Sequence, residues 1–177
     1  DDPRSAAFQY MVKNKTTFEK KYGIEFVSAR IQNVFDQYLL LNPKMDWAQT
    51  EPLVRSTFPE EADLKVSLFK MSWYRNREDV PGFLSAASAH YETYNCENAD
   101  ELNEIAWIFY KNTEDKTYLK KALKWAEKSV KIYESFYNLD TVASLQAKLG
   151  QKKSAIKSAQ KAIELAKQAG EDYSQTQ

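Results

Sequence analysis

Small residues recur at helical spacing in the C-terminal half of the chain, and this repeat constrains the fold more than any other feature. The two copies of the pattern are Ala122, Ala126, Ser129 and Ala155, Ala159, Ala162. Residues four and seven positions apart share one face of an α-helix, so small side chains there let a neighbouring helix approach closely. The pattern therefore predicts closely packed helices within residues 98–170.

Each of these helices follows another helix that has its own matched pattern. The matched positions are Leu102, Ile105, Ala106, Phe109 and Leu139, Val142, Ala143, Gln146. A related set lies further upstream, at Leu68, Met71, Ser72 and Trp73. The shift is 34 residues from Trp73 to Trp107 and 37 residues from Leu102 to Leu139. A helix pair repeated at about 34 residues is typical of tetratricopeptide repeats, here in a degenerate form.

Composition also favours helices. Four Gly and five Pro in 177 residues leave too few turn residues for an all-β fold. We therefore predict an all-α fold in which tetratricopeptide-like antiparallel helical hairpins form a right-handed stack. Residues 1–58 are expected to be N-terminal capping helices and residues 59–177 three helix pairs, together making one compact domain.

Local signals predict where the N-terminal helices begin and end. A helical stripe follows Pro3 and ends at a glycine cap, Gly23, and the next helix extends from about Glu25 to Asn42. A short helix is expected over residues 46–57. Pro52 counts against it, because proline suits only the first turn of a helix.

The three pairs are expected to begin near residues 59, 99 and 139. Asp79 with Pro81 signals the second helix of the first pair, and Asn98 with Glu101 resembles a capping box. Glycines are predicted to separate the last two helices, at Gly150, and to end the last one, at Gly170. The polar residues 171–177 are expected to fray.

Charge and hydropathy argue against two classes of partner. The 25 Lys plus Arg balance 25 Asp plus Glu, so the chain offers no broad positive surface to a phosphate backbone, and we expect no nucleic-acid partner. No apolar run approaches the roughly 20 residues of a membrane-spanning helix, so we expect no membrane span. The chain starts at Asp1 without an initiator Met or a signal-peptide pattern, which we interpret as a fragment or a mature product.

No residue is predicted to be catalytic or to bind a cofactor or a metal. Cys96 is the single cysteine, and its neighbours in sequence lack the positive charge that activates a thiol. His90 is the single histidine, so no ligand pair exists for a metal site, and a partly buried structural role is favoured. Acidic pairs at residues 60–61 and 114–115 lie at helix starts, where the helix dipole favours carboxylates.

Two rows of lysines follow the second helices of the repeats. They are Lys121, Lys124, Lys128, Lys131 and Lys153, Lys157, Lys161. A solvated convex face is the favoured interpretation, and attraction of an acidic partner is the alternative.

Several strings together resemble one family. They are residues 2–10, residues 103–110 (Asn-Glu-Ile-Ala-Trp-Ile-Phe-Tyr), residues 122–130 (Ala-Leu-Lys-Trp-Ala-Glu-Lys-Ser-Val), residues 138–141 and residues 162–172. The set is similar to the C-terminal helical region of thioredoxin-family, thiol-disulfide isomerase-like proteins of the Gram-negative cell envelope. The similarity covers most of the chain and is loose between residues 40 and 95.

The resemblance implies a periplasmic or envelope location and a thioredoxin-like domain that precedes this region in the parent protein. The redox chemistry of that family belongs to a Cys-x-x-Cys pair, which this chain does not contain. No catalytic residue is therefore carried over.

The first helices of tetratricopeptide-like pairs line the concave face of the stack. The residues expected to point into that groove are Phe69, Trp73, Asn103, Trp107 and Tyr110. Aromatic residues there would suit an apolar or extended peptide. The alternative is that the N-terminal helices fill the groove and bury both tryptophans as core.

These observations predict a non-catalytic helical module for protein or peptide interaction, not an enzyme. A structural spacer or dimerisation domain that positions a redox domain is the first alternative. Thiol-disulfide exchange in the full-length parent is the second, and a small-molecule pocket is the third.

Overall fold

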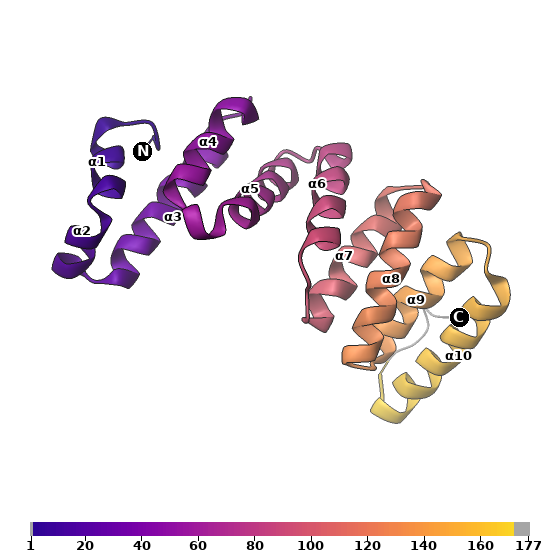
Figure 1. The fold of residues 1–177 in the computed structure, drawn as a ribbon. Coiled ribbons are helices and arrows are strands. Elements are labelled where there is room, and N and C mark those ends of the chain that lie inside the picture. The colour runs from indigo at the N-terminus through magenta and orange to yellow at the C-terminus, as the bar shows by residue number, and fades with distance from the viewer. Residues whose placement is uncertain (1, 172–177) are drawn as a thin grey trace. The chain divides into compact units, whose positions relative to one another are not determined.

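The computed structural model describes residues 2–171, and every regular element in that range is a helix (Figure 1). The predicted all-α fold is confirmed, and most of the contacts between helices join helices that are consecutive in the chain. Contacts divide the chain into two compact units, Asp1–Ala86 and Ala87–Gln177. The sequence prediction is different: one compact domain, with capping helices over residues 1–58 and helix pairs over residues 59–177.

The N-terminal unit is built from short helices around one long one. Its elements are α1 (Ala6–Lys13), α2 (Lys15–Tyr22), α3 (Ile24–Leu41), α4 (Trp47–Thr57), the 3₁₀ turn η1 (Pro59–Glu61), α5 (Ala62–Asn76) and the first half of α6 (Val80–Thr93). Helix α5 packs against α4 and α3, so the first predicted repeat helix belongs to this unit.

The first predicted helix is interrupted at Asn14, which separates α1 from α2. The side-chain amide of Asn14 donates a hydrogen bond to the carbonyl of Tyr10 at 2.9 Å. Asparagine side chains compete in this way with the helical backbone pattern, and the chain turns there. Gly23 ends α2 as predicted, with φ at +93°, and its own carbonyl accepts the first hydrogen bond of α3 from the Val27 amide. Helix α4 forms with Pro52 inside it.

Phe35 of α3 is fully buried at the centre of the N-terminal core. Its ring lies 5.9 Å from the ring of Phe8, 5.5 Å from Phe58 and 5.3 Å from Phe69, measured between centroids. Aromatic rings at such separations add packing energy beyond the area they bury. Four segments that are separate in sequence are therefore joined through one side chain.

The buried face of α5 differs from the repeat prediction. The offset of 34 residues matches Leu68 with the buried Leu102, but Leu68 is 40% exposed, while Val66 and Phe69 are buried. Helix α5 turns this other face toward the core because its packing partners are α3 and α4, whose position the repeat pattern does not encode.

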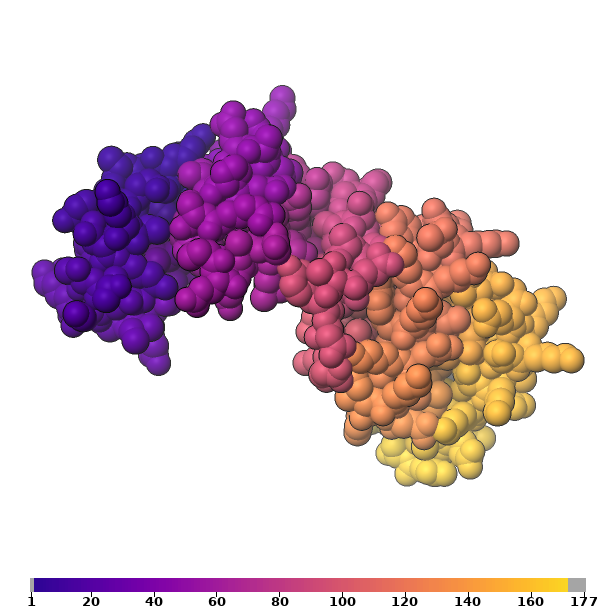
Figure 2. Space-filling view, viewed as in Figure 1, coloured from indigo at the N-terminus to yellow at the C-terminus, as the bar shows by residue number. Residues whose placement is uncertain are grey.

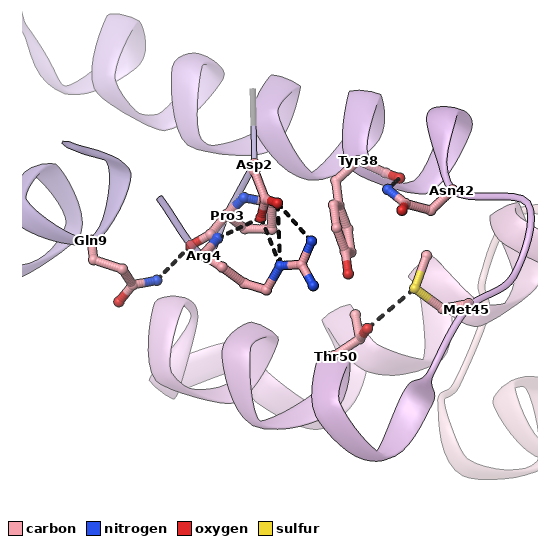
Figure 3. A network of polar contacts seen from close by, with 8 residues as sticks. All are labelled: Asp2, Pro3, Arg4, Gln9, Tyr38, Asn42, Met45 and Thr50. Atoms are coloured by element: carbon pink, nitrogen blue, oxygen red, sulfur yellow. Dashed lines mark hydrogen bonds and ion pairs between the residues drawn. The ribbon is translucent and has the colours of Figure 1, made fainter. Parts of the chain in front are cut away.

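The first residues of the chain pack against α3 (Figure 3). Pro3 is buried, and its carbonyl accepts a hydrogen bond from the Gln9 side chain at 2.7 Å. The Arg4 guanidinium pairs with Asp2 and lies 5.3 Å from the centroid of the Tyr38 ring. These contacts hold the first residues of the chain on the side of α3 from which Tyr38 projects.

The C-terminal unit contains two complete hairpins. After the second half of α6 come α7 (Ala99–Asn112), α8 (Lys116–Ile132), α9 (Phe136–Lys148) and α10 (Lys152–Ala169). Most of the small residues that define the repeat lie in the interior as predicted: Ala122, Ala126 and Ser129 have no exposed surface, Ala162 is 1% exposed and Ala155 is buried, whereas Ala159 is only half-buried. Helix α8 packs against α7 and α9, and α10 packs against α9, and Figure 2 shows the orange and yellow segments as one continuous surface.

Side-chain caps and glycines fix the ends of these helices. The Asn98 side chain accepts from the amides of Asp100 and Glu101, so the predicted cap of α7 is confirmed. The Glu101 carboxylate does not complete a capping box, because it accepts a hydrogen bond from the Tyr91 hydroxyl at 2.7 Å. Gly150 and Gly170 both have positive φ and follow α9 and α10, as predicted.

Candidate ligand groove

A groove of about 800 Å³ lies in the C-terminal unit, beside α7 and α9 and the last turn of α10. We call it the α7–α9 groove. The residues that line it are Asp100, Asn103, Glu104, Trp107, Tyr133, Glu134, Ser135, Phe136, Tyr137, Asn138, Asp140, Thr141, Leu165, Ala169 and Glu171. Its volume falls in the range of pockets that hold organic ligands.

The connection between α8 and α9 positions the aromatic side of the groove. Ser135 caps α9 by accepting from the Asn138 amide at 3.2 Å. The Asn138 side chain is buried and donates to the carbonyl of Tyr133 at 2.8 Å. This pair of hydrogen bonds fixes the backbone of residues 133–138, and it thereby sets the direction of the aromatic side chains on either side of the cap.

Four aromatic residues line the groove, two of them largely exposed. Tyr133 and Tyr137 keep 64% and 61% of their surface exposed, and the Phe136 and Tyr137 rings lie 3.8 Å apart between centroids. Trp107 comes from α7 and stacks on Tyr110, with 4.8 Å between ring centroids and 29° between ring planes. Large, semi-rigid side chains that remain exposed around a groove are typical of recognition surfaces.

Carboxylates make up the charged part of the lining. They are Asp100, Glu104, Glu134, Asp140 and Glu171. Glu134 forms an ion pair with Lys161 of α10. No Lys or Arg is among the described residues that line the groove, so its fixed charge is negative.

Asn103 contributes a buried acceptor to the groove. Its side-chain oxygen Oδ1 has no hydrogen-bond partner within the described part of the protein. A buried polar atom without a partner costs about 1–3 kcal/mol relative to a satisfied one.

The five predicted groove residues separate into three groups. Asn103 and Trp107 line the α7–α9 groove, and Asp140, the equivalent of Asn103 one repeat later, lies there too. Tyr110 is not part of the lining but supports it by stacking on Trp107.

Phe69 and Trp73 belong to the core of the N-terminal unit instead, which corrects their prediction as groove residues. Phe69 is buried, with its ring 6.0 Å from that of Phe58 between centroids. The Trp73 indole donates to the carbonyl of Asn42 at 3.0 Å and packs edge-on against Trp47. Trp73 therefore has the core role that the sequence analysis gave as the alternative, while Trp107 is among the residues that line the α7–α9 groove.

Tyr133, Phe136 and Tyr137 were not predicted to be groove residues. The sequence places the start of the third pair at Leu139, whereas α9 begins at Phe136. A serine at position 135 flanked by aromatics is the signal that was available, because Ser is a preferred N-cap residue and the aromatics then fall at the exposed helix start.

Cys96 and His90 lie near each other in sequence but outside the groove. Burial raises the pKa of the Cys96 thiol above its usual value, which is the opposite of the shift in a reactive cysteine. His90 is buried between the rings of Tyr91 and Tyr94, and burial lowers its pKa. Within residues 2–171 no group of three His, Cys, Asp or Glu side chains is arranged to hold a metal ion.

Three lysines of the predicted convex rows have structural partners, one of them being Lys161, which pairs with Glu134. Lys121 pairs with Glu92 of α6 and Lys128 with Glu97 of the α6–α7 connection, each at 2.8 Å. Lys124 and Lys131 are exposed on the same helix, as are Lys153, Lys157 and Lys161 on α10. These rows therefore both cross-link the helices and present positive charge to solvent.

Comparisons with protein-family models, with curated proteins and with solved structures gave no match. Within the described residues, no helix combines the length and apolar character that crossing a bilayer requires.

Proposed function

We propose that this chain is a non-catalytic helical interaction module that holds a protein or peptide segment in the α7–α9 groove. The observation that carries the proposal is the exposure of Tyr133 and Tyr137 beside Trp107 around a groove of about 800 Å³. Exposed aromatic side chains lose few rotatable bonds on binding and supply large contact areas, which is why they dominate peptide-binding surfaces.

Three features of the groove favour a bound segment over a reaction. Its walls are helical and are fixed by the caps at Asn98 and Ser135. The Cys96 thiol lies outside it and is shifted away from reactivity. An open groove between helices suits helix-in-groove or extended-chain recognition.

A peptide selection against the full chain tests the proposal. Peptides enriched from a random library are titrated into the ¹⁵N-labelled protein and followed by two-dimensional NMR. The indole signal of Trp107 and the side-chain amide signals of Asn103 and Asn138 should shift. Shifts confined to the N-terminal unit, or no saturable shift with any enriched peptide, would contradict the proposal.

Paired variants sharpen this test. Tyr137→Ala should weaken binding of an enriched peptide about tenfold, because hot-spot aromatics contribute about 1–2 kcal/mol. Tyr10→Ala is the matched control, since Tyr10 is exposed to the same extent, 64% against 61%, but belongs to α1. Trp107→Ala should weaken binding while leaving the melting temperature nearly unchanged, and a large drop in melting temperature would assign Trp107 to the core.

We further propose, on the sequence resemblance alone, that the module follows a thioredoxin-like domain in an envelope protein. The coding sequence upstream of Asp1 tests this. A signal peptide together with a Cys-x-x-Cys motif would support it, and the lack of both would remove it.

A further inference from the structure

Charge is segregated between the helices of the C-terminal unit. The outer helices α8 and α10 carry eleven lysines and two glutamates between them. The helices that line the groove, α7 and α9, carry four carboxylates and two lysines. The unit therefore has a positive side and a negative groove, although the net charge of the whole chain is zero.

Most of the ion pairs described for this unit involve carboxylates that lie outside the groove. Lys121, Lys128 and Lys148 each pair with a carboxylate outside the groove, at Glu92, Glu97 and Glu114. Inside the groove, the ion pair of Glu134 with Lys161 neutralises one charge. Asp100, Asp140 and Glu171 remain to set the sign of the electrostatic potential that a ligand meets.

The uncharged groups of the groove favour the same ligand chemistry. The exposed rings of Tyr133 and Tyr137 offer π-faces, which attract cations and especially the planar guanidinium group. Carboxylates and aromatic faces both interact favourably with a group that is positive and rich in N–H donors.

We propose that the occupant of the α7–α9 groove is a basic peptide segment, with at least one arginine side chain held by the groove carboxylates and tyrosines. This inference rests on the proposed peptide-binding function and specifies its partner. An acidic segment would meet repulsion from the same carboxylates, and a nucleic-acid backbone would meet it along its whole length.

Three capped peptides of equal length test the sign of the charge. They are derived from one sequence that contains two arginines beside a tryptophan, with both arginines kept, changed to glutamine or changed to glutamate. Fluorescence anisotropy of the labelled peptides with the full chain should give an affinity about tenfold higher for the arginine peptide than for the glutamine peptide. The glutamate peptide should bind more weakly than either, and added salt should narrow the differences.

Asp140→Asn tests the assignment to this groove, because Asp140 lies in its lining and the change keeps the size of the side chain. The variant should bind the arginine peptide about threefold more weakly and the glutamine peptide unchanged. Glu127→Gln is the matched control. It removes one exposed carboxylate from α8, on the lysine-rich side, and should leave both affinities as they are.

The outcomes separate this inference from the proposed function. Equal affinities for the arginine and glutamine peptides, with shifts at Trp107 and Asn103, would overturn the basic partner and leave the groove as a peptide site. Preference for the glutamate peptide, or an equal loss in Asp140→Asn and Glu127→Gln, would overturn it as well. Failure of all three peptides and of the selected peptides to shift the groove signals would overturn both proposals.

Discussion

The guanidinium of Arg77 donates to the carbonyl of Asn42 at 2.6 Å, and the same nitrogen, Nη2, lies within hydrogen-bond distance of the carbonyls of Leu39 and Leu40. One side chain that follows α5 thus caps the C-terminus of α3. The last carbonyls of a helix lack intrahelical donors and carry partial negative charge. A guanidinium at this position both donates hydrogen bonds to them and places a positive charge beside them.

Replacing Arg77 by methionine should lower the free energy of unfolding by about 1.5–3 kcal/mol, the contribution of hydrogen bonds to a charged group. Methionine keeps most of the contact of the side chain with the Trp73 ring, which the guanidinium now covers at 4.9 Å. Urea denaturation monitored by tryptophan fluorescence measures the change. Lys20→Met, on the last turn of α2 and exposed, is the control, and an equal loss in both would contradict the capping role.

Gly82 in α6 should not accept a side chain. A Cβ atom there would lie 2.3 Å from Cδ1 and 2.5 Å from Cε1 of the Tyr74 ring. Gly82→Ala should therefore destabilise the protein by about 1–3 kcal/mol, although alanine is the better helix former. Thermal unfolding followed by circular dichroism checks this. In the Tyr74→Ala background the penalty should become smaller, with the 2.9 Å approach to Asp79 Oδ2 remaining, and an unchanged penalty would show that Tyr74 is not its main cause.

Acidification should weaken the fold below about pH 6.5 through His90. Burial is the main reason that its pKa is lowered from the usual value, and Glu101 opposes the shift. Because the unfolded chain binds the proton more readily, stability is complete above the unfolded pKa and falls as the pH drops toward the folded pKa. Unfolding midpoints of the wild type and His90→Gln, measured between about pH 7.5 and about pH 5, should converge as the pH falls.

The stability of the protein should also depend on pH in a more acidic range, through Asp115, the N-cap of α8. Its pKa is lowered mainly by hydrogen bonds from Thr117, including the one from the Thr117 amide at 2.6 Å. Its contribution is therefore present above the usual aspartate pKa and is lost as the pH falls through the lower, folded value. Asp115→Asn keeps a capping oxygen without the charge. The free energy of unfolding of this variant should therefore change less than that of the wild type between about pH 5 and about pH 2.5.

Features encoded by one or two adjacent residues were predictable from the sequence. Asn98, Gly150 and Gly170 mark helix ends because the capping oxygen or the positive φ is a local requirement, and each lies where it was expected. The small-residue stripe at Ala122 and Ala126 was predictable for a similar reason, since its spacing on one helix is independent of what packs there.

Features that depend on distant partners were not predictable in the same way. Trp73 and Trp107 occupy equivalent places in the repeat pattern, yet Trp73 packs on Trp47 while Trp107 lines the groove. The repeat pattern does not include α3 and α4. Packing against these two helices determines which face of α5 is buried. Tyr133 and Tyr137 were not predictable as groove residues. Their exposure depends on the cap at Ser135 and on the hydrogen bond from the Asn138 side chain to the carbonyl of Tyr133.

Helix α6 is continuous from Val80 to Thr93, and the division between the two compact units falls within it, after Ala86. Cutting the chain at that division would leave each fragment with about seven residues of helix, fewer than an isolated helix needs to persist in water. A C-terminal fragment for crystallisation or binding studies should thus start at Asp79, so that it retains the N-cap of α6. An N-terminal fragment should extend through Thr93, and the two fragments should share those residues.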